Sequence, residues 1–353
     1  MESLKTNTNQ NLSHIVPLDF NSVLTLPESH TWASSTEHHP MTDSSVPVID
    51  LLDPNAACLI RRASEQWGVF QVVNHGIPMK LMKEAELQAR GLFKLPRDRK
   101  LRALRSQEGL TGYGRARISA NYSKLMWSEG FTIMGSPLEH ATQLWPDNHS
   151  VQTQFCNVME EYQKKMKGLC GKMIWLLLGS LGLDHEDVKW LKGPKKKCRH
   201  HPQALQLNSY PVCPDPTRAM GLAPHTDSSL LTLLNQSSIS GLQVLKDGVG
   251  WVPVHPTAGA LVVSVGDLMH ILSNGRLKST MHRAVVNKVH HRVSIAYFYG
   301  PPHDMKISPS MKLIDQDHPP LYRPVSWKEY LSIKATHFNR ALESIRNDVD
   351  IDD

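Results

Sequence analysis

The clearest periodic pattern of apolar positions lies at residues 152–181. Apolar side chains recur there with alternating spacings of four and three, which places them on one face of a helix. Flexible Met and aromatic side chains on such a face are typical of core packing. We therefore predict a long amphipathic helix whose buried stripe is Phe155, Met159, Tyr162, Met166, Leu169, Met173 and Leu176.

Shorter elements precede this helix. We expect a strand at 46–50 and then a helix that begins at Asp53 and Pro54, the N-cap and the first helical residue, and ends at Gly68. A second strand at 69–73 is closed by residues 74–76, and Pro78 opens a second helix that runs to about Phe93. The apolar stripe of the first helix is Leu59, Ile60, Ala63 and Trp67.

From residue 203 onward, short β-branched and apolar runs alternate with turns, which is typical of a barrel or sandwich. Asn274-Gly275 is a strong tight-turn signal. A last helix begins at Ser326, where Glu329 completes a capping box, with a stripe of Trp327, Leu331, Ala335, Phe338, Leu342 and Ile345. The predicted strands are 204–210, 230–234, 242–245, 251–254, 260–265, 282–287 and 292–299.

These patterns divide the chain into segments. Residues 1–45 are rich in Ser, Thr, Asn, His and Pro and predict a flexible arm. An N-terminal region of helices and strands follows at 46–150, then the long helix and a linker at 151–201, the β core at 202–302, and a C-terminal segment with its helix at 303–353.

Composition and charge narrow the class of protein. The 353 residues are 40% apolar and 20% charged, as in soluble globular proteins, and the net charge of +6 is too small to indicate nucleic-acid binding. The basic run 195–201 is interpreted as a solvated loop, with a nuclear-import signal as the alternative. The most apolar stretch, 173–183, is too short to span a bilayer.

Cysteine usage and the N-terminus bear on location. The five cysteines are odd in number, widely spaced and without a CxxC pair, which predicts reduced thiols in an intracellular protein. Residues 1–11 are polar and lack the apolar core of a secretion signal. We expect a cytoplasmic protein, with a nuclear location also open. The cysteines are Cys58, Cys156, Cys170, Cys198 and Cys213.

The motif His225-Thr226-Asp227 contains candidate metal ligands. On an extended backbone, residues i and i+2 point to the same side, so His225 and Asp227 offer an imidazole and a carboxylate together. One additional His completes the facial triad of iron oxygenases. His282, at the start of an apolar strand, is our choice. Its rivals are His255, His270, His290 and His291, of which His270 is the nearest competitor.

Two further pairs predict an anion site. Arg292 and Ser294 share one face of an otherwise apolar strand, so an inward guanidinium there demands an anionic partner, such as the carboxylate of a diacid. Asn208 and Tyr210 share the polar face of residues 205–210. That face either lines a ligand cavity or turns to solvent.

Together these residues resemble the plant 2-oxoglutarate-dependent dioxygenases. The resemblance is carried by Asn208-Ser-Tyr-Pro-Val-Cys-Pro214, by Gly221-Leu-Ala-Pro-His-Thr-Asp227, and by His282 with Arg292 and Ser294. Residues 46–50, 67–71 and 74–76 resemble the N-terminal region of the same family. Within it, the chain is most similar to the gibberellin 3-beta-hydroxylase branch, on residues 95–101, 112–119, 124–133, 270–275 and 334–339.

The resemblance implies a fold and a cofactor site. The fold would be mixed α and β, with a distorted double-stranded β-helix (jelly-roll) core flanked by helices. His225, Asp227 and His282 would bind Fe(II). Arg292 and Ser294, helped by Tyr210 and Asn208, would bind 2-oxoglutarate, and ascorbate dependence is expected.

The resemblance also implies a substrate, a nineteen-carbon gibberellin hydroxylated at the 3-beta position by a monomeric enzyme. Arg115 and Arg117 are candidates for its carboxylate anchor, with surface pairing as the alternative; Met126, Trp127 and Phe131 line the pocket or pack in the core. Residues 120–123 depart from the family pattern and leave regiospecificity open. The rival hypotheses are another oxidation, such as 2-beta hydroxylation or desaturation, and a hormone-binding protein with a relic metal site.

Overall fold

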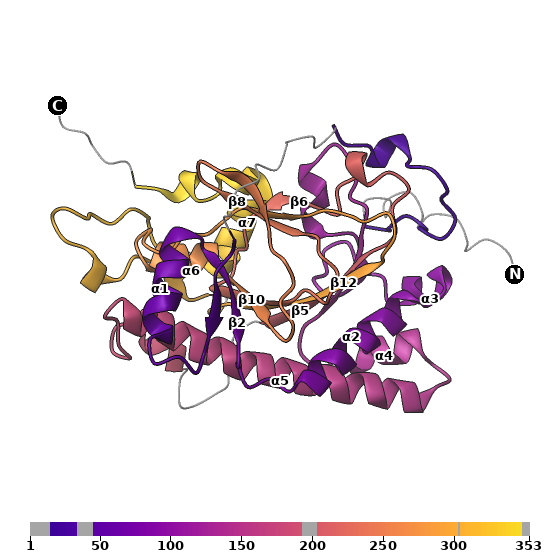
Figure 1. Ribbon diagram of the computed structural model, residues 1–353, viewed down its shortest axis with the longest axis horizontal. Helices are drawn as coiled ribbons and strands as arrows, with labels where there is room; N and C mark the ends of the chain where they lie inside the picture. The colour runs from indigo at the N-terminus through magenta and orange to yellow at the C-terminus, as the bar shows by residue number, and fades with distance from the viewer. Residues whose placement is uncertain (1–14, 34–44, 193–202, 303, 348–353) are drawn as a thin grey trace, which may run out of the picture.

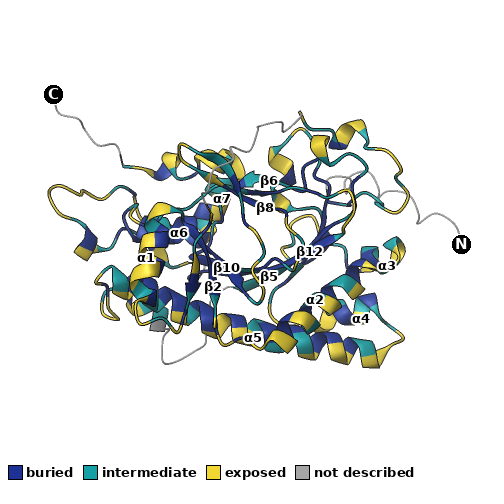
Figure 2. Ribbon diagram, in the orientation of Figure 1, coloured by how far each residue is buried: buried dark blue, intermediate teal, exposed yellow. Residues whose placement is uncertain are grey.

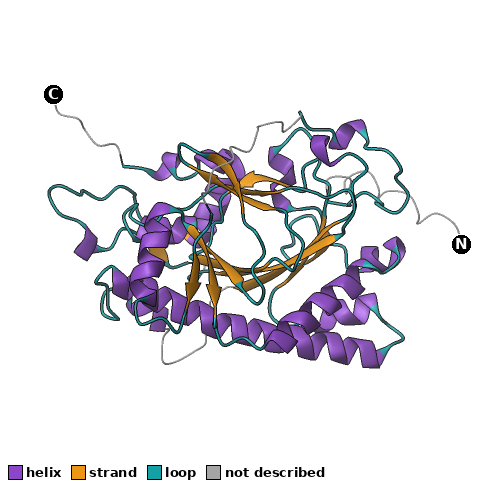
Figure 3. Ribbon diagram, in the orientation of Figure 1, coloured by secondary structure: helices purple, strands orange, loops and turns teal. Residues whose placement is uncertain are grey.

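The computed structural model describes residues 15–33, 45–192, 203–302 and 304–347. Two β-sheets face one another, and helices cover the outer face of the larger sheet (Figures 1 and 3). This is the mixed α and β arrangement with a jelly-roll core that the sequence predicts. No helix in the described ranges is both long and apolar enough to cross a membrane.

The larger sheet has eight strands in the order β1-β2-β10-β7-β12-β5-β4-β3. The smaller sheet has four, in the order β6-β11-β8-β9. A short pair, β13 (Lys306–Ile307) and β14 (Val325–Ser326), lies apart. The strands of the larger sheet are β1 (Val48–Asp50), β2 (Val69–Val73), β3 (Gly112–Gly114), β4 (Glu129–Ile133), β5 (Gln203–Tyr210), β7 (Leu231–Asn235), β10 (Leu261–Val265) and β12 (Arg292–Tyr299). Those of the smaller sheet are β6 (Leu222–His225), β8 (Leu242–Lys246), β9 (Gly250–Pro253) and β11 (His282–Ala284).

Side-chain alternation on β5 and β12 separates a core face from a site face. The two strands pair antiparallel along their whole length, so residues opposite one another share a face. Leu207 and Ile295 lie opposite each other and are buried in the main core, under the helices. Asn208 and Ser294, also opposite each other, therefore point the other way, toward the smaller sheet.

The long helix predicted from the apolar stripe is α5 (His149–Ser180), which runs beneath the larger sheet (Figure 1). The Asn148 side chain caps it by accepting a hydrogen bond from the Val151 N–H. The first six members of the predicted stripe are buried, but Leu176 is only partly buried, and Leu177 takes its place. The reason is that a repeat of seven residues drifts around a helix with 3.6 residues per turn.

Helices α1 (Ala56–Gln66) and α2 (Met79–Phe93) pack on α5, and their inner faces are buried (Figure 2). The predicted start of α1 is wrong. The Asp53 carboxylate accepts a hydrogen bond from the Asn55 N–H at 2.7 Å, and the Asp53 backbone carbonyl accepts one from the Ala56 N–H. Asp53 therefore closes a turn before the helix. Leu59 of the predicted stripe is 39% exposed. Shorter helices are α3 (Arg97–Arg102), α4 (Leu138–Leu144) and α6 (Asp267–Leu272).

The last helix, α7 (Trp327–His337), begins as predicted, because the Ser326 side chain accepts the Glu329 N–H. Its predicted apolar stripe is confirmed only in part. Trp327 and Ile345 are buried, but Leu331 and Ala335 face solvent, and Tyr330, which the stripe omits, is buried. Phe338 has a φ of 47°, which ends the helix.

Two other expectations are corrected. The flexible arm is wrong for residues 15–33, since Ile15 and His30 are buried and the Trp32 indole donates to the Leu125 carbonyl at 2.9 Å. The Asn274-Gly275 turn exists, with positive φ at both residues, but it follows α6 and joins no two strands of a hairpin. The basic run 195–201 and Cys198 lie outside the described residues; the four other cysteines are free thiols.

Candidate metal centre

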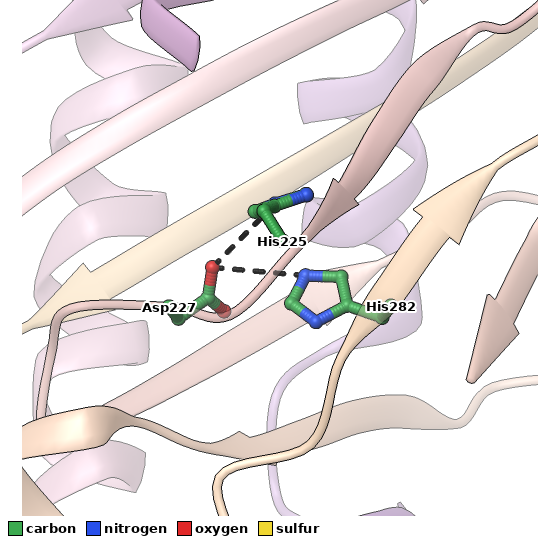
Figure 4. A group of neighbouring side chains, drawn as sticks. All are labelled: His225, Asp227 and His282. Atoms are coloured by element: carbon green, nitrogen blue, oxygen red, sulfur yellow. Dashed lines mark ion pairs between the residues drawn. The ribbon is translucent and has the colours of Figure 1, made fainter. Parts of the chain in front are cut away.

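The smaller sheet brings two histidines together. His225 ends β6, His282 begins β11, and the two residues are opposite each other in the strand register. Their ring centroids are 4.3 Å apart. Asp227 follows two residues after His225, and its Oδ1 lies 3.9 Å from His225 Nε2 and 3.7 Å from His282 Nε2 (Figure 4).

Backbone carbonyls orient both imidazoles. His225 Nδ1 donates to the Ala223 carbonyl at 2.8 Å, and His282 Nδ1 donates to the Thr280 carbonyl at 3.2 Å. A ring nitrogen that donates to a carbonyl leaves the other, Nε2, with its lone pair free for a metal. Burial, and then the neighbouring His282, lower the pKa of His225 to about 3, so its ring is neutral and able to bind a cation.

The donor set fits a transition metal. One atom from each of the three residues lies within 4.8 Å of the others. An ion with bonds of about 2.1 Å can bridge two donors up to ~4.2 Å apart, which covers both Asp227 separations. Two imidazoles and one carboxylate form the facial arrangement that suits Fe(II) and leaves coordination positions open.

The structure brings none of the four rival histidines to this site. His270 uses both ring nitrogens elsewhere, on the Leu277 carbonyl and the Tyr322 hydroxyl. His291 contacts the Ser209 hydroxyl on the other side of the larger sheet, and His255 and His290 are exposed.

A buried cation faces this metal centre from the larger sheet. Arg292 on β12 is 2% exposed and lies opposite Tyr210 on β5, with its guanidinium carbon 4.9 Å from the Tyr210 ring centre. Its Nε donates to the Ile239 carbonyl at 3.2 Å. Burial raises the pKa of Tyr210, although hydrogen bonds with Ser294 and Arg292 oppose that rise.

Arg292 lacks an acidic partner within the described residues, where no carboxylate lies within 4.0 Å of it. Burial lowers the pKa of Arg292, but a guanidinium stays charged under ordinary conditions. A buried unpaired charge is costly, so the position favours an anionic ligand. Gly241 makes room for this side chain, because a Cβ there would lie 2.8 Å from Arg292 Cδ.

The predicted substrate residues do not all reach the site. Phe131 takes the core alternative, because it lies opposite Leu207 and packs with it in the main core. Trp127 also takes the core alternative: it is fully buried in a cluster with Tyr210, and its indole donates to the Pro211 carbonyl. Met126 lies beside the metal strand, where its sulfur accepts the Ala223 N–H at 3.4 Å.

Arg115 and Arg117 have no acidic partner within 4.0 Å among the described residues. Arg115 is partly buried and Arg117 is exposed. Burial lowers the pKa of Arg115, helped by the nearby Arg97.

Tyr122 is a site residue that the sequence pattern misses. Its hydroxyl donates to the Pro224 carbonyl, directly before His225, and its ring packs edge-on against Phe338 at 5.4 Å. Tyr122 sits in the stretch 120–123 that departs from the family pattern. That departure therefore borders the metal strand. In the sequence, the departure of residues 120–123 from the family pattern is the one feature that indicated Tyr122.

Two family models match the chain. The 2OG-Fe(II) oxygenase superfamily matches residues 201–301, and the N-terminal region of the non-haem dioxygenase in morphine synthesis matches residues 46–150. Fold and site define a non-haem oxygenase that depends on Fe(II) and 2-oxoglutarate.

Solved structures and curated relatives agree with that class. JOX2 in complex with 2OG, Fe and JA has a TM-score of 0.78 at 33% identity and covers 92% of this chain and 95% of its own. The rice dioxygenase for auxin oxidation has a TM-score of 0.70 at 27% identity, covering 86% and 100%. Gibberellin 3-beta-dioxygenase 3 of Arabidopsis thaliana is 53% identical over 95% of this chain and 96% of its own length. Gibberellin 3-beta-dioxygenase 1 of Pisum sativum is 52% identical over 93% and 89%.

The chain belongs to the gibberellin 3-beta-dioxygenase family.

Proposed function

We propose that this protein hydroxylates carbon 3 of a nineteen-carbon gibberellin precursor, on the beta face, with Fe(II), O2 and 2-oxoglutarate. The observation that carries the proposal is sequence identity to five relatives that are named gibberellin 3-beta-dioxygenases. The identity is 46–53% over more than nine-tenths of the chain. The reaction oxidises 2-oxoglutarate to succinate and carbon dioxide. One oxygen atom of O2 enters succinate and the other forms the new hydroxyl group.

The residues of the site have distinct parts in this reaction. His225, Asp227 and His282 would hold the iron, which would supply the activation of dioxygen. Arg292 would bind a carboxylate of 2-oxoglutarate through its N–H donors, and Ser294 would add a hydroxyl group. Burial of Arg292 and Ser294 excludes water and strengthens these contacts.

The substrate is a rigid, mostly apolar acid, which needs apolar walls and one cationic anchor. Arg115 and Arg117 are proposed as that anchor, because neither has an acidic partner within 4.0 Å among the described residues. Met126 and Tyr122 are proposed to border the substrate, since both contact the backbone of β6 beside His225. Ascorbate dependence, a monomeric state and a cytoplasmic location, with the nucleus also open, stay predictions from the sequence.

The test is anaerobic reconstitution of the full chain with Fe(II) and 2-oxoglutarate, followed by oxygen and a panel of gibberellins that lack the 3-hydroxyl group. We expect one succinate for each 3-beta-hydroxylated product, identified by mass and by the position of the new hydroxyl. Products altered at carbon 2, or desaturated, would show another oxidation by the same site. Binding without oxygen consumption would show a hormone-binding protein, and no turnover of any member would reject the proposal.

A further inference from the structure

Thr226 stands between two metal ligands in the sequence, and its side chain enters a polar cluster behind them. Its hydroxyl donates to Asp267 Oδ2 at 3.1 Å, and Lys334 Nζ donates to the Thr226 oxygen at 2.6 Å. Asp267 begins α6, 41 residues later, and Lys334 belongs to α7, 108 residues later. The segment that carries His225 and Asp227 is thus tied to two distant helices.

Asp267 is the centre of this cluster. It is fully buried, and its carboxylate also accepts hydrogen bonds from the Ser279 hydroxyl at 2.6 Å and the Tyr330 hydroxyl at 2.8 Å, and pairs with Lys334. The Lys334 ammonium group and the hydroxyl groups of Thr226, Ser279 and Tyr330 thus surround this carboxylate.

A second contact reaches the metal ligand itself. The backbone N–H of Asp267 donates to the backbone carbonyl of Asp227 at 2.7 Å. Asp267 thus holds the metal-binding segment at two points, through the main chain of Asp227 and through the side chain of Thr226. Asp227 lies beyond the end of β6, where no strand pairing fixes its backbone.

We propose that Asp267, paired with Lys334, is a positioning residue for the metal centre, and that α7 thereby belongs to the iron site. Loss of groups that support metal ligands typically weakens metal affinity 10- to 100-fold. The cluster acts on iron(II) binding, so the inference stands whichever substrate the enzyme oxidises.

The test measures metal affinity of the full chain under anaerobic conditions, by titration with Fe(II) and separately with Mn(II). Asp267→Ala removes the carboxylate. Thr226→Val removes only the side-chain link between the metal segment and the cluster, and leaves the Asp267–Lys334 pair and the main-chain bond to Asp227 in place. We expect the dissociation constant to rise about 10- to 100-fold in Asp267→Ala and by a smaller factor, about 3- to 10-fold, in Thr226→Val. Arg323→Gln is the matched control. It breaks the exposed ion pair between Arg323 and Glu329 of α7, and it should leave the dissociation constant unchanged.

Thermal unfolding of the metal-free variants separates positioning from stability. A purely structural role lowers the melting temperature but leaves the dissociation constants for both ions within twofold of the parent, and that result for folded Asp267→Ala overturns the proposal. If Asp267→Ala does not fold, Thr226→Val decides. A folded Thr226→Val protein that binds Fe(II) and Mn(II) as tightly as the parent overturns it equally.

Discussion

At the scale of single residues, Arg292 shows why arginine and not lysine stands at the anion site. Its Nε is held by the Ile239 carbonyl, its plane lies near the Tyr210 ring, and the remaining N–H groups can fork onto one carboxylate. Arg292→Lys keeps the charge but loses the fork. Because a hydrogen bond to a charged group contributes about 1.5–3 kcal/mol, we expect the KM for 2-oxoglutarate to rise about 10- to 100-fold.

The measurement is initial velocity against 2-oxoglutarate concentration, alongside metal binding. Fe(II) affinity should not change, since Arg292 is not one of the metal ligands. Arg340→Lys, at an exposed ion pair with Glu343, is the control. An unchanged 2-oxoglutarate dependence in Arg292→Lys would mean that the cosubstrate binds elsewhere.

Gly241 is a second residue whose identity the site dictates. A Cβ there would lie 2.8 Å from Arg292 Cδ and 3.0 Å from the Val285 carbonyl oxygen. Gly241→Ala should therefore displace the Arg292 side chain, raise the KM for 2-oxoglutarate and cost about 1–3 kcal/mol of stability. Gly248→Ala is not a matched control, because Gly248 has a positive φ. Gly171→Ala on α5 is matched, because its Cβ would meet open space. Equal KM values in Gly241→Ala and the parent would contradict this reading.

At the scale of elements, α7 depends on its cap. The Ser326 hydroxyl accepts the Glu329 N–H at 3.2 Å, which satisfies one of the backbone donors that a helix start leaves unpaired. Ser326→Ala should lower the free energy of unfolding by about 1 kcal/mol. Urea unfolding measures the change, and Ser332→Ala, at an exposed position in the same helix, serves as the control. A midpoint for Ser326→Ala equal to that of the control would show that the cap contributes nothing.

Elements with an apolar or β-branched run could be predicted from the sequence, even short strands such as β8, β9 and β11, and elements without such a run could not. Strands β2, β5 and β12 and helices α2 and α5 carry long alternating or periodic runs. Strands β3 and β4 do not, because they contain glycines and the buried, charged Glu129. Glu129 is tolerated only because Lys100 and Tyr113 bind its carboxylate, a contact that no local pattern reveals.

The missed strand β4 explains why the sequence left the position of Phe131 open between pocket and core. Once β4 pairs with β5, Phe131 falls opposite Leu207 and takes the core face. The metal and anion residues stand in compact motifs whose chemistry is visible in the sequence. Asp267 and Lys334 belong to no such motif. Their role becomes visible only in the structure, where α6 and α7 meet behind Thr226.

At the scale of the whole molecule, one main hydrophobic core extends in sequence from Ile49 to Ile345 and joins the N-terminal helices, the larger sheet and the C-terminal segment. Two buried ion pairs border this core. One side of the larger sheet carries the buried Lys100–Glu129 pair, and the Asp267–Lys334 pair lies behind the metal segment. Removing one member of either pair leaves a buried charge uncompensated, so stability is sensitive to these few polar contacts.

His30, which is buried, and His291, which is partly buried, should make the metal-free protein sensitive to acid. Burial, followed by Arg115, lowers the pKa of His30 to about 4, and burial, followed by Arg90, lowers the pKa of His291 to about 4. In the unfolded chain both pKa values return to about 6.5. Between pH 6.5 and 4, the unfolded state therefore binds more protons than the folded state, and the free energy of unfolding falls as the pH falls. Each histidine contributes a slope of at most about 1.4 kcal/mol per pH unit.

Urea unfolding at pH 6.5, 5.5 and 4.5 measures this slope. His30→Gln and His291→Gln should each flatten it. The double variant should flatten it further, because His30 contacts Ser29 and His291 contacts Ser209, so that their protons act independently. Carboxylates with lowered pKa values, such as Asp247, add their own slope nearer pH 4 in every variant, so the comparison isolates the histidines. The exposed His290→Gln is the control. A parent slope equal to that of the double variant would show that His30 and His291 are not kept neutral by the fold.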